Sequence, residues 1–165
     1  MLTMESLNML RGLSALLLAS QLVGCAEGPA GVEPFELAGT SWTLVSVETP
    51  SALLRPSSGA PPTLTFTDET AEGRSGWFRF RTHGGCNLGG GIYRTDEQPL
   101  DGEASLEIDG FGWTDMACPE PDVMVLEAAY FAALAAAVSV EALADGLVIR
   151  SVDSTLMFEP VPALP

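Results

Sequence analysis

The chain has 165 residues, and Asp and Glu outnumber Arg and Lys by 22 to 7, which gives a formal net charge of −15. All of the basic residues are arginine, so no lysine is present for a Schiff base or for the Gly-Lys-Ser/Thr end of a Walker phosphate loop. The charge balance also argues against nucleic-acid binding, which rests on clustered cations that neutralise phosphates. The length suits one globular domain.

The N-terminus has the pattern of an export signal. Residues 13–23 are apolar or neutral, follow Arg11, and are too few to span a bilayer, as in a secretory signal peptide. The segment ends in Leu-Val-Gly-Cys at residues 22–25, which resembles the lipobox of bacterial lipoproteins. We predict a signal peptide over residues 1–24 and a lipidated Cys25 that anchors the protein to a membrane. The alternative is a buried N-terminal helix.

The lipobox resemblance also implies a location and a layout for the mature chain. Ala26, rather than Asp, follows the cysteine, and in lipoproteins this implies sorting to the outer membrane. We therefore expect an exported outer-membrane lipoprotein that faces the periplasm. Residues 25–36 form the lipidated start and a tether of Gly, Pro and acidic residues. The folded domain is expected over residues 37–160, and a Pro-rich tail over residues 161–165.

Alternation of apolar and polar residues predicts β-strands through most of the domain. In residues 63–67 the alternation places Leu64 and Phe66 inward and the three threonines outward. Such half-buried strands are typical of an antiparallel sheet or barrel with one wet face. The predicted strands are residues 41–48, 63–67, 77–81, 105–109, 147–151 and 154–159, with a long loop over residues 49–62.

One helix is predicted over residues 119–138. Its apolar side chains follow the spacing of a stripe that faces a core: Val123, Leu126, Tyr130, Leu134 and Ala137. The helix has no basic residue, which favours packing on the sheet over binding to an anionic membrane surface. After it, Asp145 and Gly146 have the chemistry of a two-residue hairpin turn.

Residues 82–93, THGGCNLGGGIY, gather five glycines, the single histidine and a cysteine. The glycines do not match the dinucleotide pattern between a strand and a helix. A zinc site would find only three ligands in His83, Cys86 and Cys118, and a catalytic triad built on His83 lacks a Gly-x-Ser-x-Gly elbow. We predict no catalytic residue, no metal site and no cofactor, and we interpret the glycines as a tight chain reversal.

Two cysteines remain once Cys25 carries lipid. An exported protein meets an oxidising environment, so we predict a disulfide between Cys86 and Cys118. Closing a loop of this length stabilises a fold by about 3–4 kcal/mol in the chain-entropy model. The alternative is two free thiols.

Five segments of the domain resemble, in this order, the META domain of the HslJ-like heat-shock lipoproteins. They are LAGTSWTLVSVE from Leu37, PTLTF from Pro62, GGCNLGGGIY from Gly84, TDMACPEPDVMVLEAAYFAAL from Thr114 and DGLVIRSVDSTLMFEP from Asp145. The resemblance implies an α+β fold in which a single antiparallel sheet curls into an incomplete β-barrel with one inserted α-helix. The signature positions that it carries over are Gly85, Cys86, Asn87, Tyr93, Thr114, Met116, Cys118 and Glu127.

The resemblance implies no catalytic role, and it leaves two hypotheses for function. The first is a non-enzymatic envelope lipoprotein that binds a protein partner or supports the envelope under stress, since the family is linked to heat stress. The second is a small-molecule or lipid-binding module that uses the mouth of the barrel. A cavity open to solvent would favour the second hypothesis and a filled core the first, and the side chains that decide it are Trp42, Phe66, Phe80 and Phe158.

Glu127 lies close to the apolar stripe of the predicted helix and has two interpretations. In the structural one, its carboxylate bonds backbone donors of the Gly-Cys-Asn turn and pins the helix to the sheet. In the functional one, it binds a ligand. The structural interpretation is favoured, because a buried ionised group needs partners.

Overall fold

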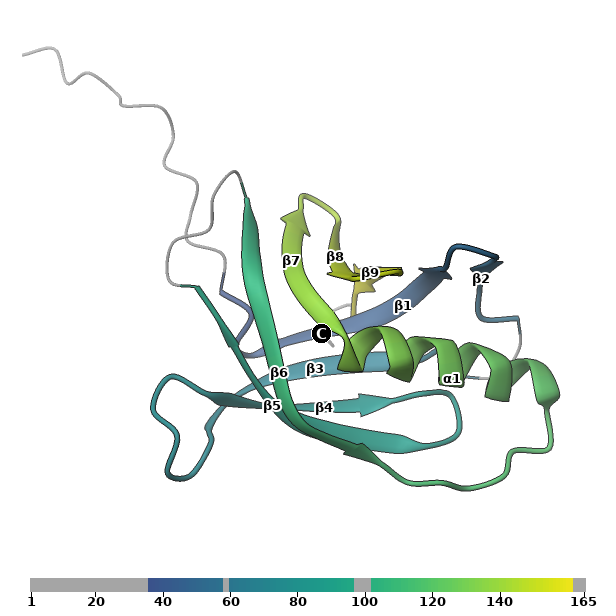
Figure 1. Cartoon of the computed structure of the whole chain (residues 1–165), viewed down its shortest axis with the longest axis horizontal. Coiled ribbons are helices and arrows are strands. Elements are labelled where there is room, and N and C mark those ends of the chain that lie inside the picture. Colours follow the sequence, from purple (N-terminus) through teal and green to yellow (C-terminus); the bar gives the residue numbers. More distant parts are fainter. Residues whose placement is uncertain (1–35, 58–59, 97–101, 162–165) are drawn as a thin grey trace, which may run out of the picture. The chain divides into compact units, whose positions relative to one another are not determined.

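The alternating segments of the domain form strands that pair into one antiparallel sheet (Figure 1). The computed structural model describes residues 36–57, 60–96 and 102–161. Within them a single helix, α1 (Pro121–Ala135), follows the sixth strand, and each of the six predicted strands is present. The strands are β1 (Thr40–Glu48), β2 (Leu53–Leu54), β3 (Thr63–Thr70), β4 (Phe78–His83), β5 (Leu88–Thr95), β6 (Glu103–Trp113), β7 (Ala137–Leu143), β8 (Gly146–Ser151) and β9 (Thr155–Pro160).

The sheet closes on itself, because β1 pairs with β3 along one edge and with β9 along the other. The closing register runs from Trp42 opposite Pro160 to Glu48 opposite Thr155. The eight strands β1 and β3–β9 therefore form a closed barrel, and the short β2 pairs with the end of β1. The α+β class, the antiparallel sheet and the inserted helix are confirmed. The prediction of an incomplete barrel is wrong, because β9 pairs with β1 along its whole length and closes the sheet.

The core is filled by inward-facing side chains of the strands and by one side of α1. Leu64 and Phe66 are fully buried in β3, as their alternation predicts. The helix packs against β1, β6, β8 and β9 and places large side chains in the same cluster. These helical core residues are Leu126, Tyr130, Phe131 and Leu134.

The helix is shorter than the predicted residues 119–138. Glu120 is its N-cap and Pro121 occupies the first turn, where proline is favoured because its missing N–H needs no partner. The helix ends at Ala135, and Ala137 already pairs with Ser151 of β8. Pairing with the sheet therefore overrides the helix propensity of the alanines that follow.

The glycine segment turns at fewer residues than predicted. The chain reverses between His83 and Leu88, and Gly89–Gly91 belong to β5, where they pair with β4. A Cβ on Gly91 would lie 2.9 Å from the ring of Phe80, so glycine makes room for the barrel core at this position.

Two further predictions about connections need correction. The loop over residues 49–62 contains β2, which is held by its pairing with β1. The hairpin after β7 turns at Ala144 and Asp145, because Gly146 already pairs with Leu143. A Cβ on Gly146 would lie 2.7 Å from the carbonyl oxygen of Phe158, so this glycine is needed for close approach of β8 to β9.

The predicted signal peptide over residues 1–24, Cys25, the tether up to residue 35 and the tail beyond Val161 lie outside the described residues. Within the described ranges, no helix is both long enough and apolar enough to cross a bilayer.

Candidate functional site

The carboxylate of Glu127 on α1 binds the turn that joins β4 to β5. Its Oε2 accepts hydrogen bonds from the backbone N–H groups of Cys86, at 3.1 Å, and Asn87, at 2.6 Å. Its Oε1 accepts a hydrogen bond from Nδ2 of Asn87 at 2.6 Å. Glu127 is only 6% exposed. A buried carboxylate with three donors is the arrangement that the structural interpretation of Glu127 predicts.

Asn87 extends this network to the segment between β6 and α1. Its Oδ1 accepts hydrogen bonds from the hydroxyl of Thr114 at 2.8 Å and from the backbone N–H of Met116 at 2.7 Å. Its Nδ2 also donates to the carbonyl of Met116 at 3.1 Å. The side chain of Met116 is 55% exposed, so this residue takes part through its main chain. One buried amide thus joins the turn, the segment that leads to the helix, and the helix itself.

Glycine is required in the turn because the helix comes so close. A Cβ on Gly84 would lie 2.5 Å from Oε2 of Glu127 and 2.6 Å from the ring of Phe131. Gly85 has a φ of +110°, which side chains disfavour, and a Cβ there would meet Val123 at 3.1 Å.

A disulfide joins the same turn to the start of the helix. Cys86 and Cys118 are bonded, with their Cα atoms 6.1 Å apart. Five signature residues and this disulfide therefore form one cluster, which we call the turn–helix network: Gly85, Asn87, Thr114, Met116 and Glu127 with Cys86 and Cys118.

Tyr93, the remaining signature residue, lies apart from the turn–helix network. It is buried in β5 against Phe66 and Phe78, with its ring centroid 4.7 Å from that of Phe66. Burial, with smaller contributions from the charges of Glu36 and Asp68, raises its pKa to about 12. Its hydroxyl donates to the carbonyl of Thr67 at 3.4 Å. The role of Tyr93 in the described structure is to fill the core.

A second buried polar contact was not predicted. The hydroxyl of Tyr130 on α1 lies 2.7 Å from the hydroxyl of Thr82, which donates to the carbonyl of Thr63 at 2.7 Å. Burial raises the pKa of Tyr130. The signal available in the sequence was the position of Thr82, which alternation places inward, two residues after Phe80.

The residues weighed for catalysis or metal binding have structural partners. Nδ1 of His83 accepts a hydrogen bond from the backbone N–H of Gly85 at 3.1 Å. Across the described residues, no three His, Cys, Asp or Glu side chains gather as a metal site would require.

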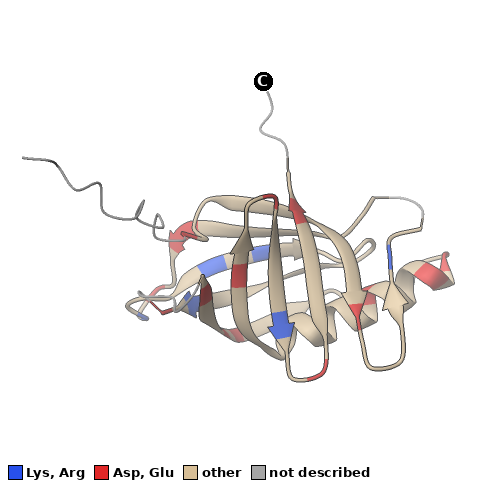
Figure 2. Ribbon diagram, turned by 90° about the horizontal axis from the view of Figure 1, so that it is seen from above, with Lys and Arg blue, Asp and Glu red and all other residues tan. Residues whose placement is uncertain are grey.

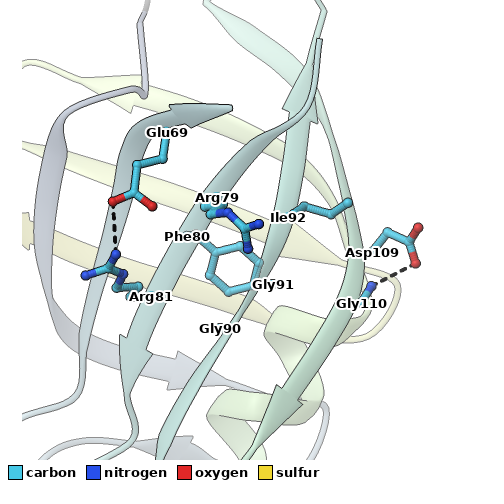
Figure 3. A pocket seen from close by; sticks show the side chains of 9 residues that line it. All are labelled: Glu69, Arg79, Phe80, Arg81, Gly90, Gly91, Ile92, Asp109 and Gly110. Carbon is cyan, nitrogen blue, oxygen red and sulfur yellow. Dashed lines mark hydrogen bonds and ion pairs between the residues drawn. The ribbon is translucent and has the colours of Figure 1, made fainter. Parts of the chain in front are cut away.

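A groove of about 490 Å³ runs over the outer face of β4 and β5 (Figure 3). Its floor is bare where Gly90, opposite the outward Arg81, carries no side chain, and Arg79 and Arg81 border it. Arg81 is paired with Glu69 at 3.0 Å. Arg79 makes no ion pair with the described residues.

The far border of the groove is formed by Asp109. It pairs with Arg74, whose hydrogen bond lowers the pKa of its carboxyl, and it also accepts a hydrogen bond from the backbone N–H of Gly110 at 2.7 Å. Both carboxylates of the groove are thus engaged by arginines, which leaves its charges largely neutralised.

Comparison with known proteins identifies the family. The model of the META domain matches residues 35–162. The chain belongs to the META domain family. The match covers every residue of the turn–helix network and the whole barrel, so this META domain is the entire described structure.

Two solved structures are similar to this META domain. An NMR structure of a protein from Burkholderia xenovorans is 25% identical, covers 82% of this chain and 95% of its own, and superposes with a TM-score of 0.55. A second NMR structure is 21% identical, covers 73% of this chain and 87% of its own, and gives a TM-score of 0.49. No curated protein matches the sequence.

Proposed function

We propose that this protein is an exported, lipid-anchored envelope protein whose META domain binds another protein and catalyses no reaction. In this proposal Cys25 carries the anchor, the outer membrane holds the protein on its periplasmic side, and binding supports the envelope under stress. The lipobox-like residues 22–25 and the short tether after them support the anchored location.

The observation that carries the proposal is the complete engagement of the polar signature residues. The carboxylate of Glu127 and the amide of Asn87 are buried and bonded to the chain itself. Groups that are already engaged in this way hold the turn and the helix in place and are not free to act on a substrate. Recognition of a partner must then use the outer surface of the barrel or of the helix.

One observation counts against the alternative, binding of a small molecule or a lipid in the barrel, and one favours it. The side chains of Phe66, Phe80 and Phe158 are buried and fill the core, as the first hypothesis predicts. A hollow of about 560 Å³ nevertheless lies beside Leu37 and Tyr93. It has the size of a ligand site, and it is where a ligand would enter if the alternative holds.

The test is to purify the lipidated protein from cells and to identify what accompanies it. We expect labelled palmitate to be incorporated into the wild-type chain but not into Cys25→Ser, and a protein partner to be captured from envelope extracts without catalytic turnover. Mass analysis of small molecules in the same sample tests the alternative. An unlabelled wild-type chain, or a bound small molecule with no protein partner, would overturn the proposal.

A further inference from the structure

The outward side of α1 is exposed and uncharged along most of its length. Val125 is 57% exposed and Met124 41%, and Ala128, Ala132 and Ala135 are exposed along the same side. An exposed side of a helix in a soluble protein ordinarily carries charged residues. The chain as a whole is strongly acidic, with a net charge of −15, so an uncharged side of a helix is unusual in it. This side of α1 is an apolar surface with no partner among the described residues.

Trp113 at the end of β6 extends this surface. It is 50% exposed, and its ring centroid lies 5.3 Å from that of Phe131 on α1. Ala128 and Ala135 are three positions before and four positions after Phe131, so they adjoin it on the helix surface. We call the resulting patch the outer helix face; it consists of Trp113, Met124, Val125, Ala128, Ala132 and Ala135.

The charged residues nearest to the outer helix face along the chain are acidic. Asp115 and Glu120 lie between Trp113 and the helix, Asp122 lies in the first turn of the helix, and all three are exposed. The sequence has no basic residue between Arg94 and Arg150. Figure 2 accordingly shows no basic residue on the helix. An apolar centre with an acidic border complements a surface that has an apolar centre and basic edges.

The outer helix face is remote from the end of the barrel where the tether joins. Glu36 lines the same hollow as Phe78, at the start of β4. Glu127 contacts the turn that follows His83, at the opposite end of that strand. The outer helix face therefore lies at the end of the barrel opposite to Glu36, the first residue that the structure describes.

We propose that the outer helix face binds an amphipathic, basic helix of a partner protein. The partner helix would lay an apolar stripe on the alanines and on Trp113, with its lysines or arginines beside Asp115, Glu120 and Asp122. This inference rests on the proposed partner-binding function and specifies the surface and the partner's chemistry.

The test uses the lipidated full chain in phosphatidylcholine vesicles and a short helical peptide of leucine and lysine. Trp113 reports binding, because Trp77 is only 5% exposed and Trp42 packs against the core. We expect the peptide to change the tryptophan emission of the wild type and not of Trp113→Phe. A matched peptide of leucine and glutamate should bind at least about tenfold more weakly.

Two arginine variants distinguish peptide binding at the outer helix face from non-specific electrostatic attraction of a basic peptide to an acidic protein. Ala132→Arg places charge and bulk at the centre of the outer helix face and should weaken peptide binding about tenfold or more. Val152→Arg adds the same charge at a side chain that is 78% exposed between β8 and β9, and it should change binding less than about twofold. Equal effects of the two variants, or equal binding of the two peptides, would overturn the inference.

Contact of the outer helix face with membrane lipid, or with a second copy of the protein, would give different results. Quenching of Trp113 by brominated lipid without peptide would place the face on the membrane, and emission that depends on protein density would place a second copy there. Either result overturns the inference. In cells, a crosslinker can be placed at position 79 in the groove or at position 132 on the outer helix face. A protein partner that is captured from position 79 but not from position 132 would support the proposed function and overturn the inference. The absence of any partner at both positions would count against both.

Discussion

The two sides of α1 differ from those of an ordinary surface helix, because a carboxylate is buried on the inner side and most of the outer side is uncharged. The inner side holds Glu127, a buried carboxylate with three hydrogen-bond donors. The outer side exposes Met124, Val125 and a row of alanines. A helix at the surface of a soluble protein normally has its apolar residues inside and its charges outside.

Folding of the domain explains the buried carboxylate on the inner side of α1, but it does not explain why the outer side is uncharged. The inner carboxylate is needed because backbone donors of the β4–β5 turn would otherwise be buried without partners. No contact within the described residues calls for an uncharged outer side. The inner side of the helix therefore contributes to the stability of the fold, and the outer side is the surface that we propose binds a partner.

The largest expected loss of stability comes from placing an arginine on the inner side of the helix, whereas the same substitution on the outer side should cost little. Ala133 is 4% exposed, so Ala133→Arg buries a charge without a partner and should cost about 4 kcal/mol or more, or prevent folding. Circular dichroism and urea unfolding measure the loss. Near-wild-type stability of this variant would mean that the inner side is not a packed core.

Removing the disulfide should have the next largest effect. Cys86 and Cys118 are 32 residues apart, and opening this loop should cost about 3–4 kcal/mol. Urea unfolding of the double variant Cys86→Ser/Cys118→Ser checks the value, with the wild type under reductant as the control. A thiol count on the denatured, unreduced protein that finds both thiols reactive would contradict the disulfide.

Glu127→Gln tests the inner carboxylate at nearly constant shape. One carboxylate oxygen would become an NH2 group that faces a donor of the turn, so we expect a loss of about 2–3 kcal/mol and a lower melting temperature. Glu69→Gln is the matched control, because it removes only the exposed pair with Arg81 and should cost about 0–1 kcal/mol. Equal losses from the two variants would show that the turn does not depend on Glu127.

The smallest expected effect on stability is that of Ala132→Arg. Ala132 is exposed and arginine is a good helix former, so unfolding free energy should change by no more than about 0.5 kcal/mol. Thermal unfolding checks this, with Ala133→Arg as the neighbouring comparison. A large loss from Ala132→Arg would mean that the outer side already has a partner within the chain.

Most of the strands and the helix could be predicted from the sequence, because each depends on local periodicity. The six predicted strands are present, and α1 lies inside its predicted range. Closure of the barrel could not be predicted in this way, since the pairing of β1 with β9 joins residues far apart in the chain. The glycines of β5 were also misleading, because Gly91 is explained by the space that Phe80 needs and not by a turn.

The candidate site was predictable only in part. The buried position of Glu127 and its bonds to a backbone turn follow from its place beside the apolar stripe of the helix. The amide of Asn87, which engages Glu127, Thr114 and Met116 together, depends on how three segments meet in space. The exposed alanines of the outer helix face were also not evident, because alanine favours helix formation on whichever side of the helix it lies.

Closure of the barrel also sets a condition on how the chain folds. Residues 42–48 of β1 pair with residues 155–160 of β9, so the first long strand completes its hydrogen bonds only with the last. Until β9 has emerged from the ribosome, β1 keeps an open edge. Contacts between such distant residues make folding slow. The barrel can therefore close only once β9 has been synthesised, and until then the edge of β1 is free to pair with other strands.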